Sequence, residues 1–358
     1  MRIHAPQVPW VTVDRVTPVE NRSDVHVEAG TVRRVSVLVT GGAGYIGAHV
    51  VRVLDLAGHD VVVADSLVTG RAARVGSAPL LEIDLAPGSA VEPLTRFMRD
   101  HRVDAVVHLA ALKRADESLH QAARYYAQNV GALTTVLLAM RCAGVRDVVL
   151  SSSAAVYGEP TTDLVTESHD TRPLTPYGAT KLACEDLLGW SAAAGDVRAV
   201  SLRYFNVAGA GWPDLGDDIA TNLVSILVDG VLRGTPPQIF GDDYPTADGT
   251  CVRDYVHVLD LAEAHVAALE RLRTSGVAHE VFNVGTGAGT SVREVVDQLE
   301  RAVDRPLGAV VLPRRSGDPA SVVGAVDAIR LAAGWRARRT LRDMIVSALE
   351  ARRTAAVD

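Results

Sequence analysis

The feature that most constrains the fold of this chain is a set of glycines placed directly after a short apolar run. Residues 35–40 are mostly β-branched, and Gly41, Gly44 and Gly47 follow them as an amphipathic stretch begins at Ile46. Such runs are typical of buried strands in a parallel sheet. Glycines at a strand-to-helix junction allow a tight turn, close approach of backbone to phosphate, and close helix packing. The sequence therefore predicts a dinucleotide-binding turn with one extra residue in its first gap.

The alternation of apolar runs and helical stretches continues beyond this turn. Further strands are expected at 60–65, 105–109 and 147–151, with helices at 46–57 and 125–142. Strands that alternate with helices indicate βαβ crossovers. We therefore predict an α/β fold, a Rossmann-type doubly wound parallel sheet with a smaller C-terminal substrate-binding region.

The distribution of polar and apolar residues divides the chain into three parts. Residues 1–33 are polar and are interpreted as an N-terminal extension, residues 34–207 as the NAD-binding domain, and residues 208–358 as the substrate-binding region. Residues 256–286 are expected to return to the first domain. The later elements expected are helices over 219–233 and 258–273 and a strand over 281–284.

Composition argues against several classes of function. The chain of 358 residues has a net charge of −7, which argues against nucleic-acid binding. No apolar run reaches the roughly 18 residues of a membrane span. Cys142, Cys184 and Cys251 lack CxxC spacing, and the histidines form no HxxxH or HxH cluster, so neither a disulfide framework nor a metal site is expected. We expect a cytoplasmic protein with reduced thiols and no membrane partner.

An acidic residue ends the second predicted strand. A carboxylate at Asp65 would hydrogen-bond the 2′-hydroxyl of an adenosine ribose and repel a 2′-phosphate. NAD(H) is therefore favoured over NADP(H), although the nearby Arg71 and Arg74 leave NADP(H) open. Further on, Asp84 and Leu85 could flank an adenine or simply belong to a loop.

A second motif carries groups suited to proton transfer. Tyr177 and Lys181 are four residues apart at the start of a predicted helix and share one face. An ammonium close to a phenol lowers the tyrosine pKa from its usual value near about 10, and a positively charged nicotinamide would add to this effect. Ser153 follows a predicted strand and could hydrogen-bond the same reacting oxygen or cap the next turn. These three residues form the predicted catalytic group, acting by general acid–base chemistry.

Several longer motifs occur in a fixed order. They are TGGAGYIGAHV, VVHLAALK, SSSAAVYGEP, PYGATK, RYFNVAGA, IFGDDYPTADGTCVRDYVHV and RRSGDPA. On these motifs the chain resembles the extended short-chain dehydrogenase/reductase family, and within it the UDP-hexose 4-epimerases, over residues 35–335. The resemblance implies reversible C4 epimerisation of a UDP-hexose, through a transient 4-keto sugar, with tightly bound NAD.

The resemblance also implies roles for individual residues. NAD contacts are implied for Gly41, Gly44, Tyr45, Ile46, Gly47, Asp65, Asp84, Leu85, Ala110, Lys113, Asn129, Ser151, Tyr177, Lys181 and Tyr204. UDP-sugar contacts are implied for Lys113, Ser153, Tyr177, Asn206, Asn222, Leu223, Gln238, Phe240, Arg253, Arg315 and Asp318. Two of these, Arg253 and Arg315, would clamp the diphosphate, whose oxygens match forked guanidinium donors. A homodimer packed through helices at 125–142 and 178–189 is implied as well.

Other functions stay open on the sequence. A 4-epimerase of another nucleotide sugar (UDP-N-acetylhexosamine, UDP-glucuronate or dTDP-hexose) is one, because Val322 falls where the family varies between a bulky aromatic and a small residue. A non-catalytic NAD-binding regulator is another, although the intact Ser-Tyr-Lys set argues against it. A 4,6-dehydratase is disfavoured because Ala154 and Ala155 stand where that reaction needs an acid/base pair.

Overall fold

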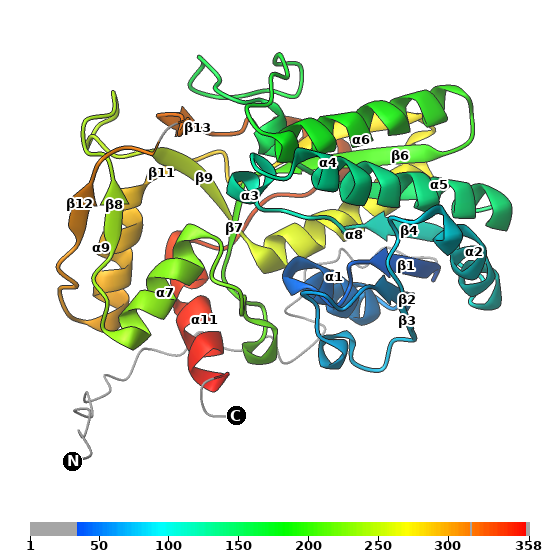
Figure 1. Ribbon diagram of the computed structural model, residues 1–358, viewed down its shortest axis with the longest axis horizontal. Coiled ribbons are helices and arrows are strands. Elements are labelled where there is room, and N and C mark those ends of the chain that lie inside the picture. Colours follow the sequence, from blue (N-terminus) through cyan, green and yellow to red (C-terminus); the bar gives the residue numbers. More distant parts are fainter. Residues whose placement is uncertain (1–33, 316, 356–358) are drawn as a thin grey trace.

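The computed structural model describes residues 34–315 and 317–355, so the expected extension over 1–33 lies outside the described residues. The strands of the main sheet are β1 (Ser36–Thr40), β2 (Asp60–Asp65), β3 (Leu80–Glu82), β4 (Ala105–His108), β5 (Asp147–Ser153), β6 (Arg198–Tyr204) and β10 (His279–Val284). They form one parallel sheet in the order β10-β6-β5-β4-β1-β2-β3 (Figure 1). This arrangement confirms the predicted doubly wound fold.

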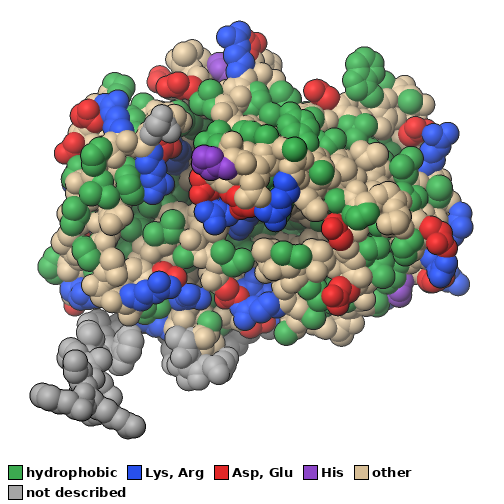
Figure 2. Space-filling view, viewed as in Figure 1, with side chains coloured by type: hydrophobic (Ala, Val, Ile, Leu, Met, Phe, Trp, Pro, Cys, Tyr) green, Lys and Arg blue, Asp and Glu red, His purple; other side chains and the backbone are tan. Residues whose placement is uncertain are grey.

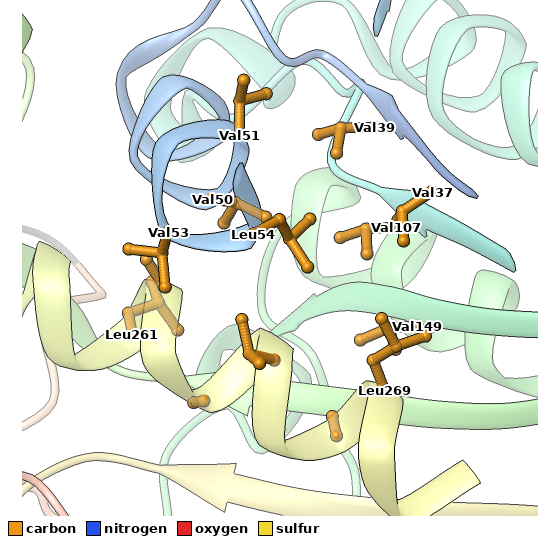
Figure 3. Close-up of a cluster of buried hydrophobic side chains, with 14 of the residues drawn as sticks. Val37, Val39, Val50, Val51, Val53, Leu54, Val107, Val149, Leu261 and Leu269 are labelled. Atoms are coloured by element: carbon orange, nitrogen blue, oxygen red, sulfur yellow. The ribbon is translucent and has the colours of Figure 1, made fainter. Parts of the chain in front are cut away.

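Helices cover both faces of this sheet because successive residues of each strand point to opposite sides. One face packs against α1 (Tyr45–Leu56), α8 (Val258–Ser275) and α10 (Asp327–Ala333). The other packs against α2 (Val91–Asp100), α5 (Gly131–Ala143) and α6 (Pro176–Ala193). In β1, for example, Val37 and Val39 point toward α1, as Figure 3 shows, whereas Leu38 belongs to the opposite cluster. The sheet is therefore buried on both faces.

A smaller lobe follows the carboxyl end of β6. Its strands are β7 (Asn206–Ala208), β8 (Gln238–Phe240), β9 (Val252–His257), β11 (Gly289–Ser291), β12 (Val310–Leu312) and β13 (Ser321–Val322). Strand β9 pairs with β7, β11 and β13, and β8 pairs with β12. The helices α7 (Leu223–Arg233), α9 (Val292–Val303) and α11 (Leu341–Thr354) enclose the apolar cluster of this lobe (Figure 1). Between these elements, α8 and β10 pass back to the main sheet.

Short helical segments complete the described chain. They are η2 (Ala72–Val75), η3 (Gly88–Ala90), α3 (Ala115–Ser118), α4 (Ala122–Tyr125), η4 (Tyr126–Val130), η5 (Ala154–Val156) and η6 (Pro213–Leu215). Within the described ranges, no helix combines the length and apolar character needed to cross a membrane.

Two predicted helices differ from the observed ones for local reasons. The helix expected at 219–233 begins only at Leu223, because the Asn222 side chain accepts a hydrogen bond from Ser225 N at 2.9 Å and caps the helix. The helix expected at 125–142 contains a π-helical turn over Tyr126–Val130. That turn carries Asn129, whose side chain bonds outside the helix, and π turns commonly occur at such functional positions.

Leu54 tests the packing of α1 between the sheet and α8. Its side chain is fully buried in the cluster of Figure 3, so Leu54→Ala is expected to lower the free energy of unfolding by about 2–5 kcal/mol. Urea unfolding measures the change. Leu331, 76% exposed, is the control, and Leu331→Ala is expected to change stability by less than about 0.5 kcal/mol. Equal effects of the two substitutions would contradict the assigned packing.

Candidate active site

The glycine turn between β1 and α1 has no room for side chains. A Cβ on Gly41 would lie 2.7 Å from Ala110 N, and Gly41 has φ +71°. A Cβ on Gly47 would lie 2.0 Å from the Gly41 carbonyl oxygen. Gly44 occupies the N-cap of α1 without a side-chain cap, and the first turn of this helix has no acidic residue. The free N–H groups and the positive end of the helix therefore fit a dinucleotide diphosphate.

Asp65 joins this turn to the end of β2. Its Oδ2 accepts a hydrogen bond from Ala43 N at 3.0 Å, and its Oδ1 accepts one from Leu67 N at 2.8 Å. Each carboxylate oxygen has a second lone pair and can still accept from a ribose hydroxyl. Arg71 and Arg74, whose proximity had left NADP(H) open, both pair with Asp218, Arg74 at 2.5 Å. This shared contact turns both guanidinium groups toward Asp218 and offsets part of their charge, which favours NAD(H).

The other residues implied for NAD surround the turn at different depths. Asp84 is exposed, and its Oδ1 accepts a hydrogen bond from Ala86 N at 3.0 Å, closing a local turn. Leu85 is buried in the core. Ile46 packs against the other core cluster. The adenine contact implied for Asp84 and Leu85 remains a prediction.

Lys113 and Tyr45 lie where the glycine turn meets the smaller lobe. Lys113 is exposed, and its Nζ is 6.0 Å from the centre of the Tyr45 ring. The Tyr45 hydroxyl donates to the Gly209 carbonyl at 2.5 Å. Lys113 also lowers the pKa of Asp217, although burial, the larger effect, raises it. An ammonium here can reach phosphates bound at the glycine turn.

Asn129 in the π-helical turn holds the backbone beside Lys113. Its Oδ1 accepts from Leu112 N at 2.8 Å, and its Nδ2 donates to the Leu112 carbonyl at 3.1 Å and to Thr180 Oγ1 at 3.0 Å. The Thr180 hydroxyl in turn donates to the Tyr177 carbonyl at 2.8 Å. Asn129 therefore connects the loop after β4 to the helix of Tyr177, and a direct cofactor contact remains a prediction.

The three predicted catalytic residues meet at the carboxyl end of β5. Ser153 and Tyr177 share a hydrogen bond, and Ser153 Oγ also accepts from Ala155 N at 3.1 Å. Ser153 thus caps the next turn and contacts the tyrosine, and its hydrogen bond to a reacting oxygen remains a prediction. The buried Lys181 ammonium lies 5.9 Å from the centre of the Tyr177 ring. It donates to the Ser151 carbonyl at 2.8 Å, which fixes α6 against β5.

Burial determines the protonation of this group in the chain alone. Burial raises the pKa of Tyr177, while the hydrogen bond from Ser153 opposes that shift. The lowered pKa expected from the Tyr177–Lys181 spacing is therefore wrong in the absence of other charges, because desolvation dominates. Burial also lowers the pKa of Lys181 to about 8.

Ser151 and Tyr204 lie on the same face of the sheet as Ser153. Their hydroxyls hydrogen-bond one another across β5 and β6. Burial raises the pKa of Tyr204 well above its ordinary value, so the phenol stays protonated. These two hydroxyls add polar groups near Lys181, whose ammonium bonds the Ser151 carbonyl.

The residues implied for the UDP-sugar form separate contacts in the smaller lobe. Arg253 Nη2 donates to Asp318 Oδ1 at 3.0 Å. The side chain implied to bind the diphosphate therefore lies next to the one implied to bind the ribose. The Arg315 guanidinium lies 3.8 Å from the centre of the Phe240 ring. Figure 2 shows basic, acidic and histidine side chains around a hollow between this lobe and the main sheet.

The remaining implied contacts lie on three elements of this lobe. Asn222 donates from Nδ2 to Asp217 Oδ2 at 2.7 Å, and it lines a cavity together with Tyr45 of the glycine turn. Leu223 is the first residue of α7, Asn206 begins β7, and Gln238 is exposed at the start of β8. The structure thus brings Asn222 close to Tyr45, and the ligand contacts of all these residues remain predictions.

Sequence reasoning missed several polar residues behind the catalytic group. Ser118 Oγ accepts from Tyr177 N at 3.1 Å and so orients the start of α6. Ser152, Glu185 and Arg203 form a buried cluster on the other face of β5. Glu185 lies one helical turn beyond Lys181, a charged residue in a helix buried against the sheet, and that spacing was the available signal.

Comparison with known proteins identifies a family and relatives that match most of this chain. The model of the NAD dependent epimerase/dehydratase family matches residues 37–285. A UDP-glucose 4-epimerase of Azospirillum brasilense is 47% identical over 315 residues, covering 87% of this chain and 89% of the relative.

Solved structures are similar over almost the whole described chain. A UDP-glucose-4-epimerase from Stenotrophomonas maltophila, with bound NAD and formylated UDP-arabinopyranose, superposes with a TM-score of 0.85 at 38% identity, covering 90% of this chain and 99% of that one. A UDP-glucose 4-epimerase from Bifidobacterium longum in complex with NAD+ and UDP gives a TM-score of 0.83 at 34% identity, with the same coverage.

His108 makes the stability of this region dependent on pH. It is buried at the end of β4, with Nδ1 2.8 Å from Thr40 Oγ1, and burial lowers its pKa to about 3. The unfolded chain protonates His108 near about pH 6.5, so its contribution is complete above that pH and is lost as the pH falls toward 3.

When the pH falls from 7.5 to 4.5, protonation of His108 in the unfolded chain is expected to lower the free energy of unfolding by about 2–3 kcal/mol. His108→Asn keeps a polar partner for Thr40 but does not titrate. Urea unfolding at the two pH values is expected to show a correspondingly smaller loss in the variant. An equal loss in both proteins would contradict the assignment.

Proposed function

This chain belongs to the NAD dependent epimerase/dehydratase family, and we propose that it interconverts UDP-galactose and UDP-glucose by reversible epimerisation at C4. The observation that carries the proposal is the meeting of Ser153, Tyr177 and Lys181 at the carboxyl end of β5. Relatives named UDP-glucose 4-epimerase, matched over most of both chains, support the choice of reaction. The enzyme is an NAD-dependent isomerase.

The catalytic side chains perform proton transfer at the sugar. Bound NAD would supply the hydride acceptor and donor that C4 requires. Tyr177 takes the proton of the 4-hydroxyl and returns it to the 4-keto sugar, and Ser153 orients the reacting oxygen. Lys181, one turn along α6, is the cation placed to stabilise the phenolate against the effect of burial. The glycine turn and Asp65 would hold NAD by its diphosphate and adenosine ribose.

The substrate residues hold the nucleotide firmly and leave the sugar free to turn over. Arg253 and Arg315 lie in the smaller lobe, where forked guanidinium groups suit a diphosphate. Arg253 now pairs with Asp318, and Arg315 covers Phe240. We propose that bound UDP replaces these internal contacts, with its phosphates on the two arginines and its ribose on Asp318. The keto sugar can then present either face of C4 to the cofactor.

We further propose a cytoplasmic homodimer. Leu138 of α5 and Trp190 of α6 are 47% and 78% exposed, on the two helices implied by the family resemblance. Two such helices from each copy would make an apolar four-helix contact. The three free cysteines suit a reducing compartment.

The reaction is tested by incubating the purified protein with UDP-galactose and no added cofactor, with product analysis by chromatography. UDP-glucose is expected, because NAD is regenerated in each cycle and stays bound. Tyr177→Phe is expected to lower the rate by at least about 100-fold by removing the proton carrier. Tyr126→Phe removes a hydroxyl from a partly exposed tyrosine and is expected to leave the rate unchanged. Absence of product even with added NAD would reject the proposal.

The dimer is tested by sedimentation of the Trp190→Arg variant. A buried cation at this position is expected to weaken association by at least tenfold, because aromatic residues dominate such interfaces. Leu331→Arg, on the exposed surface of α10, should leave the dimer intact. A wild-type protein that sediments as a monomer would refute the assembly.

A further inference from the structure

A buried ion pair lies directly behind the catalytic group. The side chains of Glu185 on α6 and Arg203 on β6 are 4% and 7% exposed, and Arg203 Nη2 donates to Glu185 Oε2 at 2.6 Å. Arg203 Nε also contacts the two carboxylate oxygens, at 3.0 and 3.1 Å. Buried pairs contribute little net stability compared with apolar packing. Such a pair at this position is therefore better explained by a geometric requirement.

Ser152 connects this ion pair to the strand that carries Ser153. Its fully buried hydroxyl donates to Glu185 Oε1. Both neighbours of Ser152 serve the site, since the Ser151 carbonyl accepts from Lys181 and Ser153 bonds the catalytic tyrosine. Because side chains alternate across a strand, Ser152 faces Glu185 on α6, whereas the Ser151 hydroxyl points to the opposite side of β5, toward Tyr204. The contact with Glu185 thus fixes strand against helix where both supply catalytic groups.

Glu185 is also coupled to Lys181 along α6. The two residues are four positions apart on one helix face. Burial lowers the pKa of Lys181, and the negative charge of Glu185 opposes this shift. Glu185 therefore favours the charged ammonium that the proposed mechanism uses.

The remaining donors of Arg203 hold the segment that follows Ser153. Arg203 Nη1 donates to the Tyr157 hydroxyl and to the Glu167 carbonyl, each at 3.1 Å. The Tyr157 hydroxyl donates to Asn283 Oδ1 at 2.7 Å, which reaches β10. The backbone is thus anchored by side chains immediately before Ser153 and four residues after it.

We propose that Glu185 is a positioning residue that, through Ser152 and Arg203, sets the separation between the catalytic serine on β5 and the Tyr177–Lys181 pair on α6. This inference rests on the proposed epimerase function. The implied nucleotide contacts lie in the other lobe, so a disturbed Glu185 lowers turnover and leaves substrate affinity nearly unchanged.

The test compares three variants of the full chain by steady-state kinetics with UDP-galactose. Glu185→Gln keeps an acceptor for Ser152 but removes the charge, and is expected to lower kcat by about 10–100-fold with KM changed less than about twofold. Ser152→Ala removes only the strand-to-helix bond and is expected to lower kcat by about 3–10-fold. The control is Asp147→Asn. It breaks the 2.7 Å ion pair between Asp147 on β5 and Arg198 on β6, at the ends of these strands that lie away from Ser152 and Arg203. Its kcat is expected to match wild type.

The outcomes separate positioning from general destabilisation. A folded Glu185→Gln enzyme with wild-type kcat overturns the proposal, as does an equal loss of kcat in Asp147→Asn. If Glu185→Gln does not fold, Ser152→Ala decides, and an unchanged kcat there overturns the proposal. A wild-type protein without epimerase activity overturns the proposed function and this inference with it, whereas wild-type kcat in the variants overturns the inference alone.

Discussion

The main sheet of this protein is entirely parallel and buried on both faces, and the active site depends on that arrangement. Parallel strands need crossover helices, which cover both faces and leave polar groups only at the strand ends. The carboxyl ends of β1, β2, β4, β5 and β6 therefore lie at one edge. The glycine turn, Asp65 and Ser153 lie at this edge because each stands at the carboxyl end of a strand, and the start of α6 brings Tyr177 to Ser153.

Two kinds of contact shape the site at this edge of the sheet. Backbone crowding excludes side chains from the glycine turn, where a Cβ on Gly47 would collide with the Gly41 carbonyl. Side-chain bonds set the rest, as Lys181 joins Ser151, Asn129 joins the loop after β4 to α6, and the charged cluster of Glu185 supports the strand from behind. In the proposed function the turn holds the cofactor, and the side-chain bonds align the proton-transfer groups.

The proposed substrate and cofactor sites lie mainly on different parts of the chain, and internal contacts connect these parts. Tyr45 of the glycine turn bonds the backbone of Gly209, and Asp218 from the smaller lobe pairs with both Arg71 and Arg74. These contacts place the segment before α7 against the cofactor turn.

The sequence by itself determined the alternating strands and helices, the glycine turn, Asp65 and the catalytic trio, because each depends on local spacing and backbone sterics. Local rules failed where a side chain bonds outside its own element, as Asn129 does in the π-helical turn. Only the tertiary structure paired Arg71 and Arg74 with Asp218 and Arg253 with Asp318, and placed Ser152 on Glu185. It also buried Tyr177, and in the chain alone this burial raises the pKa of the phenol. Desolvation and long-range pairing depend on how distant segments pack, which spacing along the chain does not encode.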